Sequence, residues 1–342
     1  MKPAGAFGPD HPRRARPTRV LVVAILTAAA LLSACTSRPP ATSATEPATS
    51  SATTATAATS TAPAPSSSPS TTATFGRDGV PRFAHVFVVL MENLGYAPAM
   101  ATPGLAALAD RYARATDYWA ISHPSLPNYL AITSGSTWGI SSDCTGCYVS
   151  ASNLGEQLSA AGVTWGAYLE GVPTSCYLDP YSDDPLYAGK HNPFRYYTDI
   201  RRSRALCSHL EPFGQLTRAL AEARATIPQF VWITPNLCHD GHNCDPQVAA
   251  SWLDGFVASV VKTSAWRHGG VMFVTWDESE SGGPMGGQVL TLVIAPGLKR
   301  GLALGAYYTH YSLLATIEDA FDLPLLRQAR SARPMTAFFR SG

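Results

Sequence analysis

The chain has 342 residues with a formal net charge of +1 at pH 7, and 46% of its residues are hydrophobic. This length and apolar content fit one large globular domain with a sizeable core. The near-neutral charge, with no long basic block outside the N-terminus, argues against nucleic acid as a partner.

The first 35 residues have the pattern of a bacterial export signal. A basic region precedes an apolar run over residues 20–32, which is short for a stable membrane-spanning helix. The run ends in Leu32-Ser33-Ala34-Cys35, which resembles a bacterial lipobox, so we expect Cys35 to be lipidated and to begin the mature protein. An ordinary signal peptide cut near Ala34 and a simple anchor helix are the alternatives. The basic residues are Arg13, Arg14, Arg16 and Arg19.

Residues 36–74 consist almost only of Ser, Thr, Ala and Pro, and Arg38 and Glu46 carry the only charges. Such a composition cannot bury enough apolar surface to offset its loss of conformational entropy. We therefore predict a disordered tether here, which holds a folded catalytic domain at residues 75–342 away from a membrane.

Six of the seven cysteines remain after Cys35. An even number in an exported domain favours disulfides over free thiols. Pairing between neighbours in the sequence is our expectation, although six cysteines allow fifteen connectivities. The spacing Cys144-x-x-Cys147 also fits a zinc site, but no second close pair of that kind follows it. The expected pairs are Cys144–Cys147, Cys176–Cys207 and Cys238–Cys244.

The folded part begins with a continuous apolar run at residues 83–90, which is typical of a strand buried in a parallel sheet. Further strands are predicted at residues 163–168, 229–234, 270–276 and 288–295. Helices are predicted at residues 102–114, 125–132, 153–161, 211–224, 247–262 and 311–321. Residues 171–208 are predicted to be an irregular insertion. Strands that alternate with helices predict an α/β fold, a mostly parallel sheet sandwiched between helices in a single domain.

Polar residues follow three of the predicted strands. Glu92-Asn93 ends the first, Asn236 follows a middle one, and Asp277-Glu278 ends the strand at residues 270–276. Ligands of open parallel sheets bind outside the carboxyl ends of the strands. Oxygen ligands from Glu, Asn and Asp suit a hard divalent cation, so we predict one metal ion at this edge. Each group taken alone could equally be a helix cap or a solvated turn.

Several further polar side chains could serve the same edge. Asp240 and His242 lie in the predicted disulfide loop at residues 238–244, Lys190 and His191 lie in the irregular insertion, and His310 starts the last helix. A His or Lys near a carboxylate-bound metal can hold an anionic substrate or protonate a leaving group. The alternative is that these are ordinary surface residues.

Ser125 stands at the predicted start of a helix. A serine there gains from the helix dipole, a metal beside it would stabilise its alkoxide, and a phosphate would meet backbone N–H groups. The folded part has no Gly-x-Ser-x-Gly motif, which argues against the usual serine hydrolase. Ser125 is therefore a candidate nucleophile, with a turn serine as the alternative.

An ordered set of motifs over residues 83–324 resembles the bacterial phosphoesterase family, which contains acid phosphatases and phospholipases C. Within that family the chain is most similar to secreted acid phosphatases that act on phosphatidylinositol 3-phosphate. The resemblance implies an alkaline-phosphatase-like fold. The motifs are Met91-Glu92-Asn93, Thr102-Pro103-Gly104-Leu105, Ser122-His123-Pro124-Ser125-Leu126-Pro127-Asn128-Tyr129, Tyr187-x-x-Lys190-His191, Thr234-Pro235-Asn236, Asp240-x-His242, Thr275-Trp276-Asp277-Glu278 and His310-Tyr311-Ser312-Leu313-Leu314.

The resemblance also implies roles for these residues. Ser125 is the nucleophile, and a divalent metal ion beside it is bound by Glu92, Asn93, Asp277 and Glu278. Asp240, His242 and His310 hold the phosphoryl oxygens, the leaving group or a second ion. The implied substrate-binding residues are His123, Asn128, Lys190, His191 and Asn236.

One departure from the family concerns the residues after Asp277-Glu278. Many phospholipase C members continue into a Gly-rich stretch that ends in Asp-His, whereas this chain reads Ser279-Glu280-Ser281-Gly282-Gly283. This difference leaves a second metal site and phospholipase activity open.

The leading hypothesis is a lipid-anchored, extracytoplasmic phosphomonoesterase that acts on a phosphorylated small molecule or a phospholipid. The enzymatic alternative is a phospholipase C, and a catalytically silent lipoprotein that binds phosphorylated ligands is the alternative of another class. The sequence gives no oligomeric state.

Overall fold

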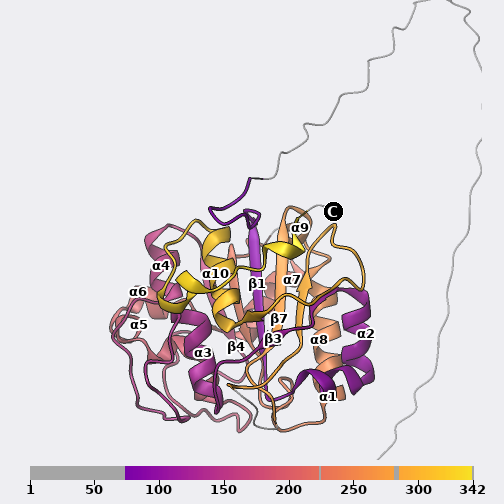
Figure 1. Ribbon diagram of the computed structural model, residues 1–342. Helices are drawn as coiled ribbons and strands as arrows, with labels where there is room; N and C mark the ends of the chain where they lie inside the picture. The colour runs from indigo at the N-terminus through magenta and orange to yellow at the C-terminus, as the bar shows by residue number, and fades with distance from the viewer. Residues whose placement is uncertain (1–73, 223–224, 281–284, 341–342) are drawn as a thin grey trace, which may run out of the picture. The chain divides into compact units, whose positions relative to one another are not determined.

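An eight-stranded sheet with the order β5-β4-β6-β1-β7-β8-β2-β9 forms the centre of the computed structural model, which describes residues 74–222, 225–280 and 285–340 (Figure 1). The predicted leader, residues 1–35, and all of the predicted tether except Thr74 lie outside the described residues. The strands of this sheet are β1 (His85–Met91), β2 (Ala113–Ala115), β4 (Trp165–Leu169), β5 (Leu210–Pro212), β6 (Phe230–Thr234), β7 (Gly270–Trp276), β8 (Thr291–Ile294) and β9 (Ala303–Leu304).

The five strands from β5 to β7 are parallel to one another, which confirms the predicted mostly parallel sheet. β1 reads HVFVVLM, and all of its residues after His85 are buried. A strand covered on both faces must be apolar at every position, which is why this run could be recognised in the sequence.

The far edge of the sheet differs from the prediction. β8 pairs antiparallel with both β7 and β2. The helix expected at residues 102–114 ends at Arg111, because Ala113–Ala115 leaves it to form β2 between β8 and β9. A segment this short has no periodicity that sequence analysis could detect. A second small sheet pairs β3 (Tyr118–Trp119) with β10 (Tyr308–Thr309).

Two groups of helices pack around the sheet: α3 contacts α4 and α10, and α8 contacts α2 and α7. None of the helices in the described part of the chain is both long and apolar enough to cross a membrane. The helices are α1 (Tyr96–Ala101), α2 (Pro103–Arg111), α3 (Ser125–Ser134), α4 (Leu154–Ala160), α5 (Thr198–Arg202), α6 (Arg204–Cys207), α7 (Phe213–Ala221), α8 (Pro246–Val260), α9 (Ser264–Arg267) and α10 (His310–Ala320).

The predicted irregular insertion, residues 171–208, contains only short helices: the 3₁₀ turns η1 (Gly189–His191) and η2 (Pro193–Tyr196), and then α5 and α6. The side chain of Arg195, which is only 1% exposed, connects this insertion to the rest of the domain. Arg195 donates to the carbonyl oxygens of Leu178 at 3.0 Å and Thr145 at 3.2 Å. This contact joins the insertion to residues 144–147 and places η1 against α3.

Three disulfides connect Cys144 with Cys147, Cys176 with Cys207, and Cys238 with Cys244. The predicted pairing of sequence neighbours is confirmed. The zinc alternative for Cys144 and Cys147 is wrong, because both sulfur atoms are used in the bond between them.

Glu318 on α10 is a buried carboxyl group away from the strand ends. Its Oε1 accepts from Leu326 N at 2.9 Å, whereas its Oε2 and the neighbouring Gln157 Oε1 are buried with no hydrogen-bond donor among the described residues. Burial raises the pKa of Glu318 to about 9. A proton on Oε2 can then donate to its surroundings, so we infer that the group is neutral at pH 7.

This placement makes stability depend on pH. The pKa of Glu318 is raised on folding, so the folded state keeps a proton that the unfolded chain loses above pH 4.5. Stability should therefore fall as pH rises from about 5 to 9, by up to about 1 kcal/mol per pH unit. Urea unfolding should show Glu318→Gln to be more stable than the parent, with a gain that grows over this range. Exposed Glu222→Gln is the control, and a gain that does not change with pH would contradict the prediction.

Candidate active site

The carboxyl ends of β1 and β7 bring the first four site residues together. The two strands are parallel and in register, with Met91 opposite Trp276, so Glu92-Asn93 and Asp277-Glu278 leave the sheet side by side. Asp277 N donates to Met91 O at 3.0 Å, and Asn93 N donates to Asp277 Oδ1 at 3.0 Å. The structure therefore brings these two strand ends together, as predicted.

Ser125, the first residue of α3, points into this group. It is 1% exposed, and its Oγ donates to Glu92 Oε2 at 3.1 Å and lies 3.5 Å from Glu278 Oε1. α3 packs on α10, and its residues are buried throughout, so the helix is fixed in the core. The hydroxyl group therefore contacts two carboxylates, one that follows β1 and one that follows β7.

The side chain of Asn93 faces the same carboxylates. Its backbone has φ 39°, in the left-handed region that Asn tolerates better than most residues. As oriented, the amide oxygen lies 2.9 Å from Glu92 Oε2 and 3.2 Å from Asp277 Oδ1, and a 180° rotation of the amide would put its nitrogen there as a donor. Asp277 Oδ2 is also buried without a donor among the described residues. A buried carboxylate oxygen without a donor, beside the carboxylate of Glu92, fits a cation at this point.

The charges of this group point the same way. Burial raises the pKa of Asp277 well above its usual range, and the charges of Glu92 and Glu278 add to the effect. Burial, followed by the charges of Glu92 and Asp143, raises the pKa of Glu278 to about 8. Part of this rise comes from repulsion among the three carboxylates, which a divalent cation between them would relieve.

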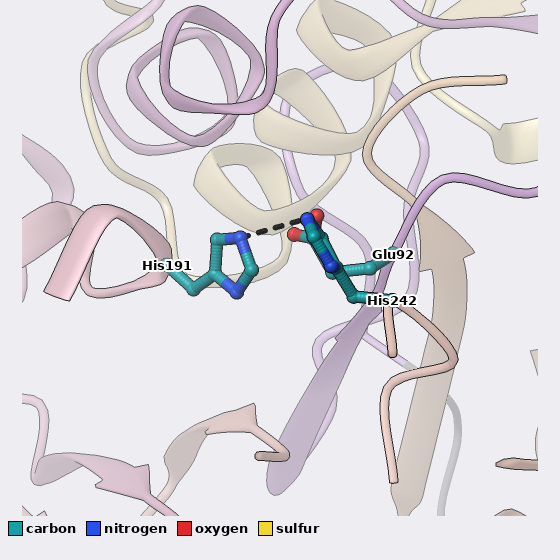
Figure 2. A group of neighbouring side chains, drawn as sticks. All are labelled: Glu92, His191 and His242. Carbon is teal, nitrogen blue, oxygen red and sulfur yellow. Dashed lines mark ion pairs between the residues drawn. The ribbon is translucent and has the colours of Figure 1, made fainter. Parts of the chain in front are cut away.

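His191 supplies one positive charge beside Glu92. Its Nε2 lies 3.1 Å from Glu92 Oε2 (Figure 2). Its Nδ1 lies 3.4 Å from Asp240 Oδ2. Burial lowers the pKa of His191, but the charge of Glu92 and the hydrogen bond to Asp240 outweigh burial and raise it to about 10. For Glu92, burial raises the pKa, but the charge and hydrogen bond of His191 outweigh it and lower the value. The two side chains form a buried ion pair.

His242 lies at the exposed end of this cluster. Glu92, His191 and His242 each offer a ligand atom, and these atoms lie within 4.8 Å of one another (Figure 2). Nitrogen and oxygen ligands of this kind suit a borderline metal such as zinc, whereas the oxygen set suits a harder cation. The two sets share Glu92, so the metal predicted from the sequence has two adjoining positions that it could fit.

Lys190 and His123 complete the predicted set around the nucleophile. Lys190 Nζ lies 2.8 Å from Asp143 Oδ2, and His123 Nδ1 contacts Glu278 Oε2. Burial lowers the pKa of Lys190, but the hydrogen bond of Asp143 and the charge of Glu92 outweigh it and raise the value, so the ammonium group stays charged.

Three predicted residues hold the site together in this structure. Asn128 accepts from Ile121 N at 2.9 Å and Ser122 N at 3.0 Å, which shapes the turn before Ser125. Asn236 Oδ1 accepts from Cys238 N at 3.1 Å and His239 N at 3.0 Å, which shapes the disulfide loop.

His310, the third, lies behind Asp277. Burial lowers the pKa of His310 to about 4, so its ring is neutral. Nε2 lies 2.6 Å from Asp277 O and Nδ1 lies 3.1 Å from Tyr118 Oη. In the neutral ring Nε2–H donates to the carbonyl and Nδ1 accepts from the tyrosine. His310 thus positions the Asp277 strand end and has no nitrogen left for a phosphoryl oxygen.

Tyr129 and Asp143 belong to the site but were given no role in the sequence analysis. Tyr129 Oη donates to Glu92 Oε1, and its ring stacks on His191 at 5.3 Å. Its spacing of four residues from Ser125 on one helix was a usable signal, since such residues share a face. Asp143 carried no such signal, because only the fold brings it to α3.

Comparisons with known proteins match most of the folded part of this chain. Residues 78–324 match the profile of the Phosphoesterase family. A probable acid phosphatase of Kluyveromyces lactis is 28% identical over 71% of this chain and 59% of its own length. A phosphatidylinositol-3-phosphatase of Mycobacterium tuberculosis is 27% identical over 75% of this chain and 83% of its own length. This chain thus spans less than two thirds of the fungal relative.

Solved structures are similar in fold at low sequence identity. A Bacteroides thetaiotaomicron protein of glycosaminoglycan metabolism has a TM-score of 0.51 and 11% identity, over 76% of this chain and 82% of its own. A Vibrio parahaemolyticus protein of the alkaline phosphatase superfamily has a TM-score of 0.48 and 10% identity, over 75% of this chain and 72% of its own.

Proposed function

Because the chain belongs to the phosphoesterase family, a family of hydrolases that cleave phosphate esters, we propose that it is a phosphomonoesterase with Ser125 as nucleophile. The observation that carries this proposal is the contact of the buried Ser125 Oγ with Glu92 and Glu278, carboxylates from two neighbouring strand ends. The acid phosphatase relatives support the reaction class. Phosphatidylinositol 3-phosphate is the proposed substrate, on the strength of the mycobacterial relative.

The chain's own residues can carry a two-step reaction. Ser125 Oγ forms a bond to phosphorus as the ester P–O bond breaks, and Glu92 Oε2, to which the hydroxyl donates at 3.1 Å, accepts its proton. The exposed His242, whose ring lies 5.8 Å from that of His191, supplies a proton to the leaving oxygen. Water then forms a bond to phosphorus and gives a proton to His242, while the Ser125 Oγ–P bond breaks and Oγ takes its proton back from Glu92, which releases phosphate and restores the enzyme.

A divalent metal ion would be held by Glu92, Asn93, Asp277 and Glu278, and it would supply positive charge for the phosphoryl oxygens and the serine oxygen. These residues fit such an ion, because Asp277 Oδ2 is buried without a hydrogen-bond donor among the described residues. Lys190 and His191 add the charge that a phosphate dianion requires.

Hydrolysis of p-nitrophenyl phosphate and bis(p-nitrophenyl) phosphate, with and without a chelator, tests this function. A phosphomonoesterase hydrolyses the monoester faster and loses activity to the chelator. A faster reaction on the bis-ester would favour a phospholipase C. Binding of phosphate with no hydrolysis of either compound would favour the silent binding lipoprotein.

We also propose that the enzyme works outside the cytoplasm, anchored by lipid on Cys35. The lipobox pattern and the Ser/Thr/Ala/Pro composition of residues 36–74 support this placement. Acyl chains contribute roughly 0.8 kcal/mol per buried CH₂, so several chains make a durable anchor. The protein should partition into detergent, and Cys35→Ser should release it or stall its processing. Recovery of all wild-type protein in the medium with an unmodified N-terminus would rule out the anchor.

A further inference from the structure

Asp143 already places a carboxylate at the start of the nucleophile helix. Its Oδ1 accepts from Leu126 N at 3.0 Å, and its Oδ2 lies 2.8 Å from Lys190 Nζ. Leu126 directly follows Ser125 in α3. The two oxygens of Asp143 are therefore bound to a helix N-terminal N–H group and to an ammonium group.

These two donors are the ones that a phosphoryl group would use. Backbone N–H groups in the first turn of a helix and a lysine ammonium group are typical phosphate ligands. α3 offers few such donors, because Pro127 has no N–H group. The Lys190 ammonium also lies in the field of Glu92 and Asp277, within the same cluster as Ser125. A phosphate dianion in this cluster would therefore compete with Asp143 for Leu126 N–H and Lys190 Nζ.

We propose that Asp143 is a specificity-determining residue that occupies the phosphate donors Leu126 N–H and Lys190 Nζ in the free enzyme and yields them to the substrate. This inference rests on the proposed phosphomonoesterase function. A monoester dianion binds these donors strongly enough to offset the loss of the Asp143 contacts. A phosphodiester carries a single negative charge and binds the donors less strongly. Asp143 thereby favours monoesters over diesters.

The surroundings of Asp143 allow this exchange. The side chains of Asp143 and Lys190 are 27% and 23% exposed, so the carboxylate can turn toward solvent and the pair is partly screened. The backbone beside Asp143 stays in place, since the Cys144–Cys147 disulfide closes the loop and Arg195 donates to Thr145 O at 3.2 Å. The carboxylate can therefore return when the product leaves.

Calorimetric titration of the metal-loaded, full-length protein with inorganic phosphate tests the proposal. Asp143→Asn keeps an acceptor for Leu126 N–H but removes the negative charge that pairs with the Lys190 ammonium group. It should lower the Kd for phosphate about threefold to tenfold, the range expected for a partly exposed ion pair plus a removed like charge. It should also lower the preference for monoesters, measured as kcat/KM for the monoester divided by kcat/KM for the diester. Asp183→Asn, which removes an exposed carboxylate from the insertion that carries Lys190, should change neither quantity.

A double mutant locates the effect. In a Lys190→Met background, which should itself weaken phosphate binding, Asp143→Asn should change the Kd less than about twofold. If Asp143→Asn folds poorly, Asp143→Ser also offers Leu126 N–H an acceptor and should change the Kd in the same direction. Unchanged or weaker phosphate binding in these folded variants would overturn the competitor role and leave Asp143 as a helix cap. Failure of the parent protein to bind phosphate would instead overturn the proposed function together with this inference.

Discussion

Replacing Ser125 with alanine should lower the turnover of p-nitrophenyl phosphate by at least about a hundredfold, because the covalent step loses its nucleophile. The fold should survive, since the substitution removes one oxygen atom whose contacts are Glu92 Oε2 and Glu278 Oε1. Steady-state kinetics together with thermal unfolding measure both quantities.

Ser122→Ala is the matched control for this variant. Ser122 lies three positions before Ser125, and its Oγ donates to His123 O at 3.0 Å, away from the carboxylates. Its activity should stay within a few-fold of that of the parent. Near-normal turnover in a well-folded Ser125→Ala protein would return Ser125 to the role of a turn residue.

Asp277→Asn should lower bound metal and turnover together. The substitution removes one anionic ligand from the buried group that includes Glu92 and Glu278, and an amide holds a divalent cation more weakly than a carboxylate does. Elemental analysis of the purified protein gives the metal content, and p-nitrophenyl phosphate gives the activity. Added metal should restore part of the activity if weaker binding is the cause.

Glu318→Gln is the matched control here, because it is also an isosteric amide replacement of a buried carboxyl group with a raised pKa. It should keep both metal and activity. Active wild-type protein that contains no metal and ignores chelators would show the metal assignment to be wrong. The three clustered carboxyl groups would then act through a shared proton.

The central strands, their polar ends and the disulfides could be predicted, because each depends on residues that are close together in the sequence. The apolar run at β1 and the strand β7 had to be continuous, since both faces of a central parallel strand are covered. The polar residues Glu92 and Asp277 follow these strands directly, and parallel strands end at the same edge. The pairing of neighbouring cysteines was likewise a short-range matter.

The sequence by itself therefore determined the α/β class, the strand ends that meet and, through the ordered motifs, the family. Only the tertiary structure decided which side chains touch. Asp143 reaches α3 through a loop held by a disulfide and Arg195, and His310 turns both nitrogens to Tyr118 and Asp277. Asn128 and Asn236 accept hydrogen bonds from backbone N–H groups, and β2 forms because β8 and β9 flank it. These contacts join residues distant in the chain or depend on rotamers set by packing, and neither leaves a periodic pattern in the sequence.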